Sequence, residues 1–428
     1  MIKELQKLFK TITLTDIDSL KDIMNNHIYL EFASLYPNLK DILVFGNERD
    51  PQEFNRTVKH IFRTIKVFLL IQEGKFDYSG FSPNSINQIL AKIKKISDFN
   101  MDLIPIILVY HDIGKFIRKR DHPQQSFKLI YEKGLLNPFK LNKKIQVLIK
   151  KVIQYHVLFA TIYTGESTYY GTYSLIHDTE LVNLMLESQY LNLFIDCLEV
   201  FTYIDILGYS YSQIFDHYIK YYEEINLNLK EILSLLPSIE SALERALFYS
   251  HSWIEWRIAG ALRIFQFVST QPYLTPEFYF DKLKLSMNSI PNDVLVDKNW
   301  ENLVRNDLKH SNRIQIKYGL AFLMILAFGS FHRASINENV EISPNLLSFW
   351  ILITEEIIKR SKEDTKAPWN VYILGVKNWF SIPTKTLKKI NLSYIRSILN
   401  DANSEYDNNI NEYTLNLDLS KIEEKDIN

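Results

Sequence analysis

The segment from Pro105 to Lys115, PIILVYHDIGK, restricts the possible folds of this chain more than any other. Its apolar residues must be buried, and they lead directly into His111 and Asp112. Burying an ionisable pair is costly unless hydrogen bonds, opposite charges or a metal ion replace the lost water. Imidazole and carboxylate together suit Mn, Fe, Zn and similar divalent ions. The segment therefore predicts a buried His-Asp pair, for which a metal ion is the most direct compensation.

A shortage of helix breakers favours an all-α fold. The 428 residues include only 12 Gly and 13 Pro, while 46% are hydrophobic, so we expect long helices around a substantial core. Lys plus Arg (49) nearly cancels Asp plus Glu (50). The net charge therefore does not indicate binding to nucleic acid. Nucleic acid remains a possible partner only through a local basic patch.

The sequence predicts a cytoplasmic protein that does not enter a membrane. Cys197 is the single cysteine, so neither an intramolecular disulfide nor a cysteine zinc site can form. The N-terminal residues lack the apolar core of a signal peptide. The most apolar stretch, Tyr318 to Phe331, is short for a membrane span and predicts a buried helix.

Capping residues predict where the early helices begin. Thr15 and Asp18 have the spacing of a helix cap, and Asp50-Pro-Gln-Glu53 is a stronger start signal. The helix that follows Asp50 carries an apolar stripe at helical spacing: Phe54, Val58, Ile61, Phe62, Ile65, Phe68 and Leu69. His60 lies beside this stripe. Taken alone, His60 is typical of a surface or boundary histidine.

Two further histidines lie at positions that each have an ordinary explanation. His122 precedes a proline at a predicted helix start, where a capping or exposed residue is usual. His156 continues the apolar face of a helix predicted from about Lys143 to Tyr163, where a lone histidine is usually a satisfied core residue. The stretch that follows, YTGESTYYGTYS, predicts a polar loop at a pocket mouth.

A long helix predicted from about Asp178 to Leu207 supplies an acidic candidate. Asp205 continues its apolar stripe near the helix end, where a carboxylate needs a cation or several donors. Asp196 shares a face with Glu199 and is predicted to be solvated. We therefore favour Asp205 as a ligand.

The remaining sequence predicts more helices but no recognisable site. The expected organisation is a domain over residues 1–230, a C-terminal helical region over 231–400 and a polar, flexible tail over 401–428. Further helices are predicted to begin near Ser238, Thr275, Ile314 and Ser343. An aromatic and basic cluster, Trp253, Trp256 and Arg257, is more typical of core and boundary than of a nucleic-acid platform.

The candidate residues lie in order on successive predicted helices, mostly on or beside faces that must pack together. The simplest joint explanation is one metal centre inside a helical bundle. A helical scaffold whose histidines are structural remains the alternative. The proposed ligands are His60, His111, Asp112, His122, His156 and Asp205.

This order resembles the HD superfamily of metal-dependent phosphohydrolases, whose pattern is His, then His-Asp, then a distant Asp. Residues 50 to 215 carry the resemblance, and its most specific part is LVYHDIGK, Leu108 to Lys115. The resemblance implies an HD-type bundle in which His60, His111, Asp112 and Asp205 hold one ion. His122 and His156 match the additional histidines of two-metal members, in which Asp112 would bridge the ions.

The chain departs from particular branches of that family. The cyclic-dinucleotide phosphodiesterases have a second histidine after the one that matches His156, and this chain has Val157. Their downstream Gly-Tyr-Pro motif is replaced by TGESTYYG. The stringent-response hydrolases have an acidic pair where this chain has Ile113-Gly114-Lys115. The subfamily and the second metal therefore stay open.

The predicted function is hydrolysis of a phosphate ester, a nucleotide or phosphodiester, by a metal-activated water. One or two divalent ions (Mn, Fe, Mg, Zn or similar) would serve, with Asp112 central to catalysis. Lys115, and Arg118 in the following basic run, would attract substrate phosphate. His122 and His156, if not coordinated, would donate protons. The alternative function is a catalytically silent module that senses a metal or nucleotide.

Overall fold

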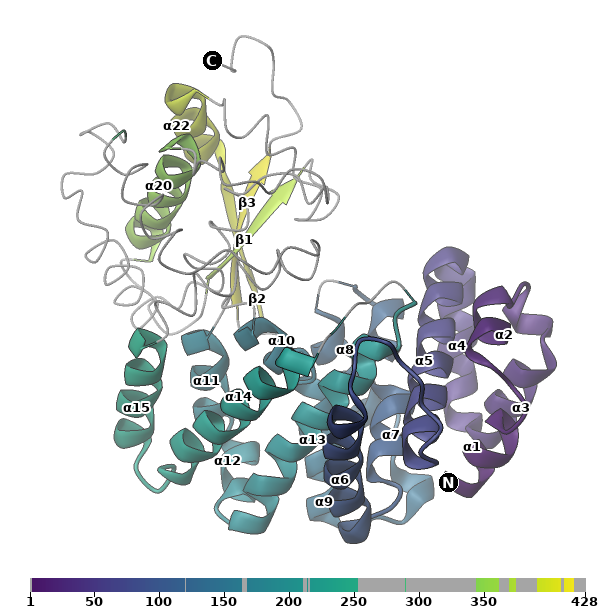
Figure 1. The fold of residues 1–428 in the computed structure, drawn as a ribbon. Coiled ribbons are helices and arrows are strands. Elements are labelled where there is room, and N and C mark those ends of the chain that lie inside the picture. Colours follow the sequence, from purple (N-terminus) through teal and green to yellow (C-terminus); the bar gives the residue numbers. More distant parts are fainter. Residues whose placement is uncertain are drawn as a thin grey trace. The chain divides into compact units, whose positions relative to one another are not determined.

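The computed structural model describes residues 2–119, 121–163, 168–210, 214, 216–252, 289, 344–361, 369–374, 391–408 and 412–418. The chain divides into two compact units, residues 1–160 with 176–239, and residues 161–175 with 240–428. Helices dominate the described residues (Figure 1), which confirms the predicted all-α class. None of the described helices has the length and apolar character needed to cross a membrane.

Short helices at the N-terminus pack against the first long one. They are α1 (Ile2–Phe9), α2 (Leu14–Ser19), the 3-10 helix η1 (Ile23–Asn25), α3 (His27–Leu35) and α4 (Pro37–Arg49). Thr13, and not Thr15 as predicted, caps α2. Its side chain accepts from the amide of Asp16, whose carboxylate accepts from the Thr13 amide. The sequence contains two Thr-x-x-Asp patterns two residues apart, and the first of them forms the cap.

Helix α5 (Pro51–Gln72) begins as predicted, with Asp50 accepting from the amides of Gln52 and Glu53. Its apolar stripe is buried, and so is His60 beside that stripe. The ammonium of Lys66 donates to the carbonyl of Phe9 at 2.9 Å, which fastens α1 to α5. Helix α5 is therefore a fixed support for the residues that project from it.

The predicted focal segment forms a short, completely buried helix. All eight residues of α7 (Leu103–Tyr110) are buried, and the chain continues through His111 and Asp112 into η2 (Ile113–Phe116). A Cβ on Gly114 would lie 2.1 Å from the carbonyl oxygen of His122, so only glycine permits η2 to contact helix α8. Around these elements lie α6 (Pro83–Phe99), α8 (His122–Glu132), η3 (Asn137–Phe139) and α9 (Lys143–Gln154).

Two predicted long helices are each interrupted. The helix expected from Lys143 to Tyr163 ends at Gln154 and resumes as α10 (Leu158–Tyr163), with His156 in the break. The helix expected from Asp178 is divided into α12 (Thr179–Met185) and α13 (Ser188–Leu207). Part of the predicted polar loop after Tyr163 is helical, as α11 (Thr168–His177). The first unit also contains α14 (Asp216–Ser234) and ends at Ile239, the first residue of α15 (Ile239–Ser252). Residues 161–175, which include most of α11, belong to the second unit.

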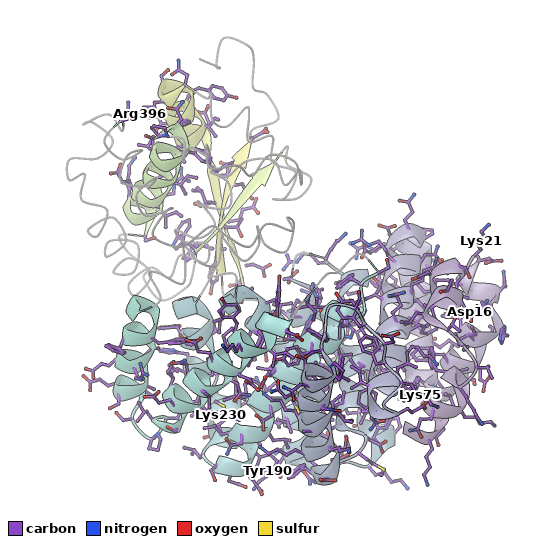
Figure 2. All side chains as sticks on the ribbon, viewed as in Figure 1. Asp16, Lys21, Lys75, Tyr190, Lys230 and Arg396 are labelled. Carbon is purple, nitrogen blue, oxygen red and sulfur yellow. The ribbon has the colours of Figure 1, made fainter. Side chains whose placement is uncertain are left out.

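Helix α13 is buried on almost every side because it contacts α5, α6, α7, α9, α12 and α14. The prediction that Asp196 is solvated is wrong, since its side chain is 9% exposed. Its carboxylate accepts from Lys95 at 2.8 Å, Lys230 at 2.5 Å and Asn226 at 3.0 Å; Lys230 is labelled in Figure 2. Glu199, one turn later, is fully buried and accepts from Lys92 and Asn226. These donors from α6 and α14 hold α13 in place.

The second unit combines helices with a small sheet. Its described elements include α20 (Pro344–Arg360), α22 (Leu392–Asp401), β1 (Trp369–Leu374), β2 (Asn403–Asp407) and β3 (Glu412–Asp418). The strand order is β1-β3-β2, with β1 parallel and β2 antiparallel to β3. The prediction of a loose tail after residue 401 does not hold for β2 and β3, because the two strands pair with each other and Leu415 and Leu417 of β3 are fully buried. The helices predicted from Thr275 and Ile314, the apolar stretch 318–331 and the cluster 253–257 lie outside the described residues.

Candidate metal centre

The structure brings the six proposed ligands together inside the first unit. They form two groups whose ligand atoms lie within 4.8 Å of one another: His60, His111 and Asp205 in the first, and Asp112, His122 and His156 in the second. These residues come from α5, the end of α7, the start of α8, the end of α9 and the last turn of α13. Buried His/Asp clusters of this kind are able to bind a metal ion.

Three of the histidines are oriented in the same way by backbone carbonyls. The Nδ1 atom of His111 contacts the carbonyl oxygen of Leu108 at 2.9 Å, and that of His156 contacts the oxygen of Ile153 at 2.7 Å. His122 Nδ1 lies 3.1 Å from the carbonyl oxygen of Lys119. A carbonyl can only accept, so we assign the proton of each ring to Nδ1. In the neutral form of each ring, Nε2 then presents a lone pair, as metal-ligating histidines do.

The Nε2 atoms are placed where these lone pairs require a cation. His122 Nε2 and His156 Nε2 lie 3.1 Å apart, so two acceptors face each other. His111 Nε2 is buried and has no hydrogen-bond partner. Buried acceptors without a donor are costly. Divalent ions at the two groups would satisfy all three in their neutral form, so the donor set fits a metal centre.

The carboxylate of Asp112 lies between the two groups. Its Oδ2 atom is 3.4 Å from His111 Nε2 and 3.7 Å from His60 Nε2. Its Oδ1 atom is 3.2 Å from His122 Nε2 and 4.0 Å from His156 Nε2. One carboxylate oxygen therefore faces each group, so Asp112 could contribute to both.

Asp205 completes the first group from α13. Its Oδ1 atom is 2.8 Å from His60 Nε2 and 3.4 Å from His111 Nε2. The sequence favoured Asp205 over Asp196 as the ligand, and the structure places Asp205 in the cluster and Asp196 in the lysine network of α13.

Burial and mutual charge set the protonation of the cluster. Burial opposes ionisation of Asp112 and Asp205, but the cations and histidines around them hold both carboxyl pKa values below their usual range. Burial lowers the pKa of His60, and burial with the neighbouring His122 lowers that of His156 to about 3. Burial also opposes charge on His111, but the two carboxylates outweigh it and raise its pKa to about 9. Neutral His60 and His156 with ionised aspartates are the forms that bind metals.

Lys115 neutralises Asp112 directly. Its ammonium lies 2.5 Å from Asp112 Oδ2, and its side chain is 11% exposed. The same ammonium lies 3.5 Å from the hydroxyl of Tyr209, whose ring stacks on His60 with centroids 4.0 Å apart. Sequence reasoning missed Tyr209. The available signal was its spacing, one helical turn after Asp205.

Arg118, a predicted phosphate contact, pairs with Asp121. Its Nε and Nη2 atoms lie 2.5 and 2.7 Å from the two carboxylate oxygens. Arg49 from α4 donates to the carbonyls of Phe116 and Ile117 and so anchors the start of the same loop. The structure therefore gives Arg118 a role in holding the loop that leads to His122.

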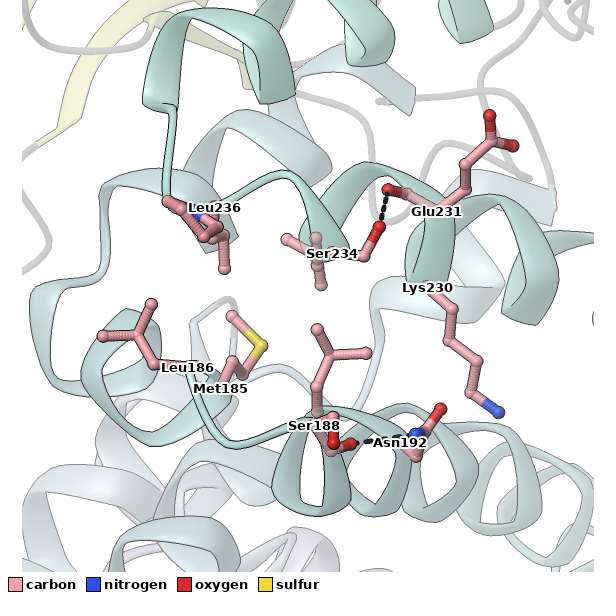
Figure 3. A pocket seen from close by; sticks show the side chains of 11 residues that line it. Met185, Leu186, Ser188, Asn192, Lys230, Glu231, Ser234 and Leu236 are labelled. Carbon is pink, nitrogen blue, oxygen red and sulfur yellow. Dashed lines mark hydrogen bonds between the residues drawn. The ribbon is translucent and has the colours of Figure 1, made fainter.

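A pocket in the same unit lies apart from these residues. It has a volume of about 410 Å³ and is lined mainly by apolar side chains of α12, α13, α14 and the turns after α12 and α14 (Figure 3). Among them are Met185, Leu186, Leu191, Leu233 and Leu236. It shares no residue with the His/Asp cluster.

No family model, curated protein or solved structure matches this chain.

Proposed function

We propose that this chain is a metal-dependent phosphohydrolase that acts on a phosphate ester, either a nucleotide or a phosphodiester. The observation that carries the proposal is the position of Asp112, with one carboxylate oxygen toward each of two His-containing groups. Two divalent ions close together are a recurrent arrangement for phosphoryl-oxygen displacement. The order of the ligands along the chain, which resembles the HD superfamily, agrees with this assignment.

The composition of the two groups favours particular ions. Each group offers two imidazoles, and Asp112 contributes to both. Mg²⁺ prefers oxygen ligands, whereas imidazole suits Mn, Fe and Zn. We therefore place Mn, Fe or Zn ahead of Mg, with one ion held by His60, His111, Asp205 and Asp112. The second ion would be held by Asp112, His122 and His156.

The bound ions would polarise the phosphoryl group and lower the pKa of a water molecule, so that hydroxide forms near neutral pH. The residues of the chain would position the reactants. Lys115 supplies positive charge next to Asp112, where it can draw a phosphate group toward the ligands. His156 is held neutral by burial, so it suits a ligand and not the proton donor that the sequence left open.

Metal content and turnover, measured on the same samples, test this proposal. Wild type would be compared with Asp112→Ala and with the more conservative Asp112→Asn, whose folding is checked by circular dichroism. Asp98→Ala, an exposed aspartate at the end of α6, is the matched control. Each protein would be supplied with Mn²⁺, Fe²⁺ or Zn²⁺ and assayed on a chromogenic phosphodiester and a nucleotide panel.

We expect wild type and Asp98→Ala to hold metal and to turn over substrate, and both Asp112 variants to lose most of their activity. If wild type holds metal but hydrolyses nothing on the panel, the hydrolase proposal is overturned and the sensing module is favoured. A wild type that binds none of the three ions would overturn the metal centre itself.

A further inference from the structure

Two polar groups that are not among the six ligands meet at the edge of the cluster. The hydroxyl of Tyr209 lies 3.5 Å from the ammonium of Lys115. Lys115 contacts Asp112, which is shared by both ligand groups, and the ring of Tyr209 stacks on His60 at an interplanar angle of 21°. The pair is therefore fixed against ligands of both groups.

The backbone around Tyr209 is anchored on both sides. Before it, the guanidinium of Arg63 on α5 donates to the carbonyl of Gly208 at 2.8 Å. After it, the amide of Ile214 donates to the hydroxyl of Tyr78 at 2.9 Å. These two contacts, from Arg63 on α5 and from Tyr78 in the loop before α6, help to hold the side chain of Tyr209 in place before any ligand binds.

Gly208 permits the close approach of this segment to α5. A Cβ at that position would lie 2.4 Å from the side-chain methyl group of Thr64 and 3.2 Å from Cε1 of His60. Any larger residue would push the segment outward, and the ring of Tyr209 would move away from His60. The sequence Asp205-Ile-Leu-Gly-Tyr209 therefore places a ligand and an aromatic hydroxyl on one side of the cluster.

We propose that Lys115 and Tyr209 form the subsite for a phosphoryl group of the substrate. The ammonium contributes charge, and the Tyr209 hydroxyl donates a hydrogen bond to a non-bridging phosphoryl oxygen. An ammonium binds phosphate as a point charge, and a phenol adds one directed donor. This inference rests on the proposed function and deepens it, because it assigns a substrate-contacting role to Tyr209.

The charges around Lys115 make this subsite dependent on metal. Without a divalent ion, the ammonium is held by Asp112 at 2.5 Å. With a divalent ion held at Asp112, the carboxylate would no longer need the Lys115 ammonium, which would then be available to phosphate. Phosphate should therefore bind to the metal-loaded protein much more tightly than to the metal-free protein.

The test is binding of inorganic phosphate to the full chain loaded with Mn²⁺. Affinity would be measured by calorimetry, and proximity to the ion by paramagnetic broadening of the phosphorus NMR signal. Tyr209→Phe removes the hydroxyl but retains the ring on His60. Tyr131→Phe makes the same change at a tyrosine that is 71% exposed. Bound Mn²⁺ would be quantified in every sample.

We expect Tyr209→Phe to retain the wild-type Mn²⁺ content and to bind phosphate at least about ten-fold more weakly, since a hydrogen bond to a charged group is lost. Tyr131→Phe should behave as wild type. Equal phosphate affinity in wild type and Tyr209→Phe would overturn the subsite and leave the proposed function intact. A Mn²⁺-loaded wild type that binds no phosphate would overturn the subsite together with the proposed function.

Discussion

Replacing Lys115 with methionine tests whether a cation belongs beside Asp112. Asp112 is 2% exposed, and Lys115 is the nearest positive charge, at 2.5 Å. Truncating one partner of a buried ion pair typically costs about 3–5 kcal/mol, because the other charge is left unsupported. Asp112 can limit this cost by taking up a proton. Protonating a carboxyl of ordinary pKa, about 3.9, near pH 7 costs about 4 kcal/mol, so we expect a loss of about 3–4 kcal/mol in the metal-free protein.

The same substitution should cost much less when a divalent ion is bound, because the ion then compensates Asp112. We expect less than about 1 kcal/mol, the range of an ordinary surface contact. The assay is urea unfolding followed by far-ultraviolet circular dichroism, with chelator and with saturating Mn²⁺. Hydrogen exchange in α7 would localise the effect. Lys94→Met, an exposed lysine of α6, is the control. An equal loss with and without metal would refute this reasoning.

Three further predictions concern the surroundings of the site. Gly114→Ala should lower the free energy of unfolding by about 2–3 kcal/mol and reduce metal content, because its Cβ would meet the carbonyl oxygen of His122 at 2.1 Å; urea unfolding and metal analysis check both effects. Metal affinity should rise with pH, since the raised pKa of His111, about 9, means that binding must displace a proton. For the metal-free protein the same shift stabilises the fold below about pH 6.5, and the contribution is lost as the pH rises through about 9; competition titrations and unfolding across this range would show both trends. Asp196→Ala should destabilise the fold by about 1–3 kcal/mol with no direct effect on metal stoichiometry in the folded fraction, because it removes an acceptor from the partly buried Lys230 and from the buried Asn226.

Part of the candidate site could be predicted because local rules place several of its residues. Helix periodicity places His60 and Asp205 on or beside buried stripes, and the apolar run before His111 requires that the pair be buried. The structure brings these residues together. Each histidine alone has an ordinary explanation. The prediction of a metal centre therefore depended on the order of these residues along the chain.

Residues whose roles depend on distant partners could not be predicted in this way. Asp196 was expected in solvent because its own helix offers no cation, but Lys95 of α6 and Lys230 of α14 supply two. Tyr209 stacks on a residue of α5 that lies far away in the sequence. Such contacts are set by tertiary packing. For Tyr209 the sequence offered only its spacing from Asp205, which does not identify the partner on α5.

The C-terminal strands and the broken helices show the limits of composition and of periodicity. The polar composition after residue 401 predicted a flexible tail. The same residues also contain the alternation typical of a strand, since Tyr413, Leu415 and Leu417 of β3 are two residues apart. The apolar face from Ile145 to Ile153 continues to His156, but the helix ends at Gln154. The apolar periodicity continued beyond the end of α9 because His156, in the break after the helix, is also buried.

The carbonyls that orient His111 and His156 belong to the last turns of α7 and α9. Carbonyls of a final turn have no amide partner within their own helix, and here an imidazole N–H takes that place. Each ring therefore acts as the C-terminal cap of the helix that delivers it. When the last turn of either helix opens, its histidine also loses its orientation. The residence time of a bound ion should therefore shorten as these two helix ends open more often.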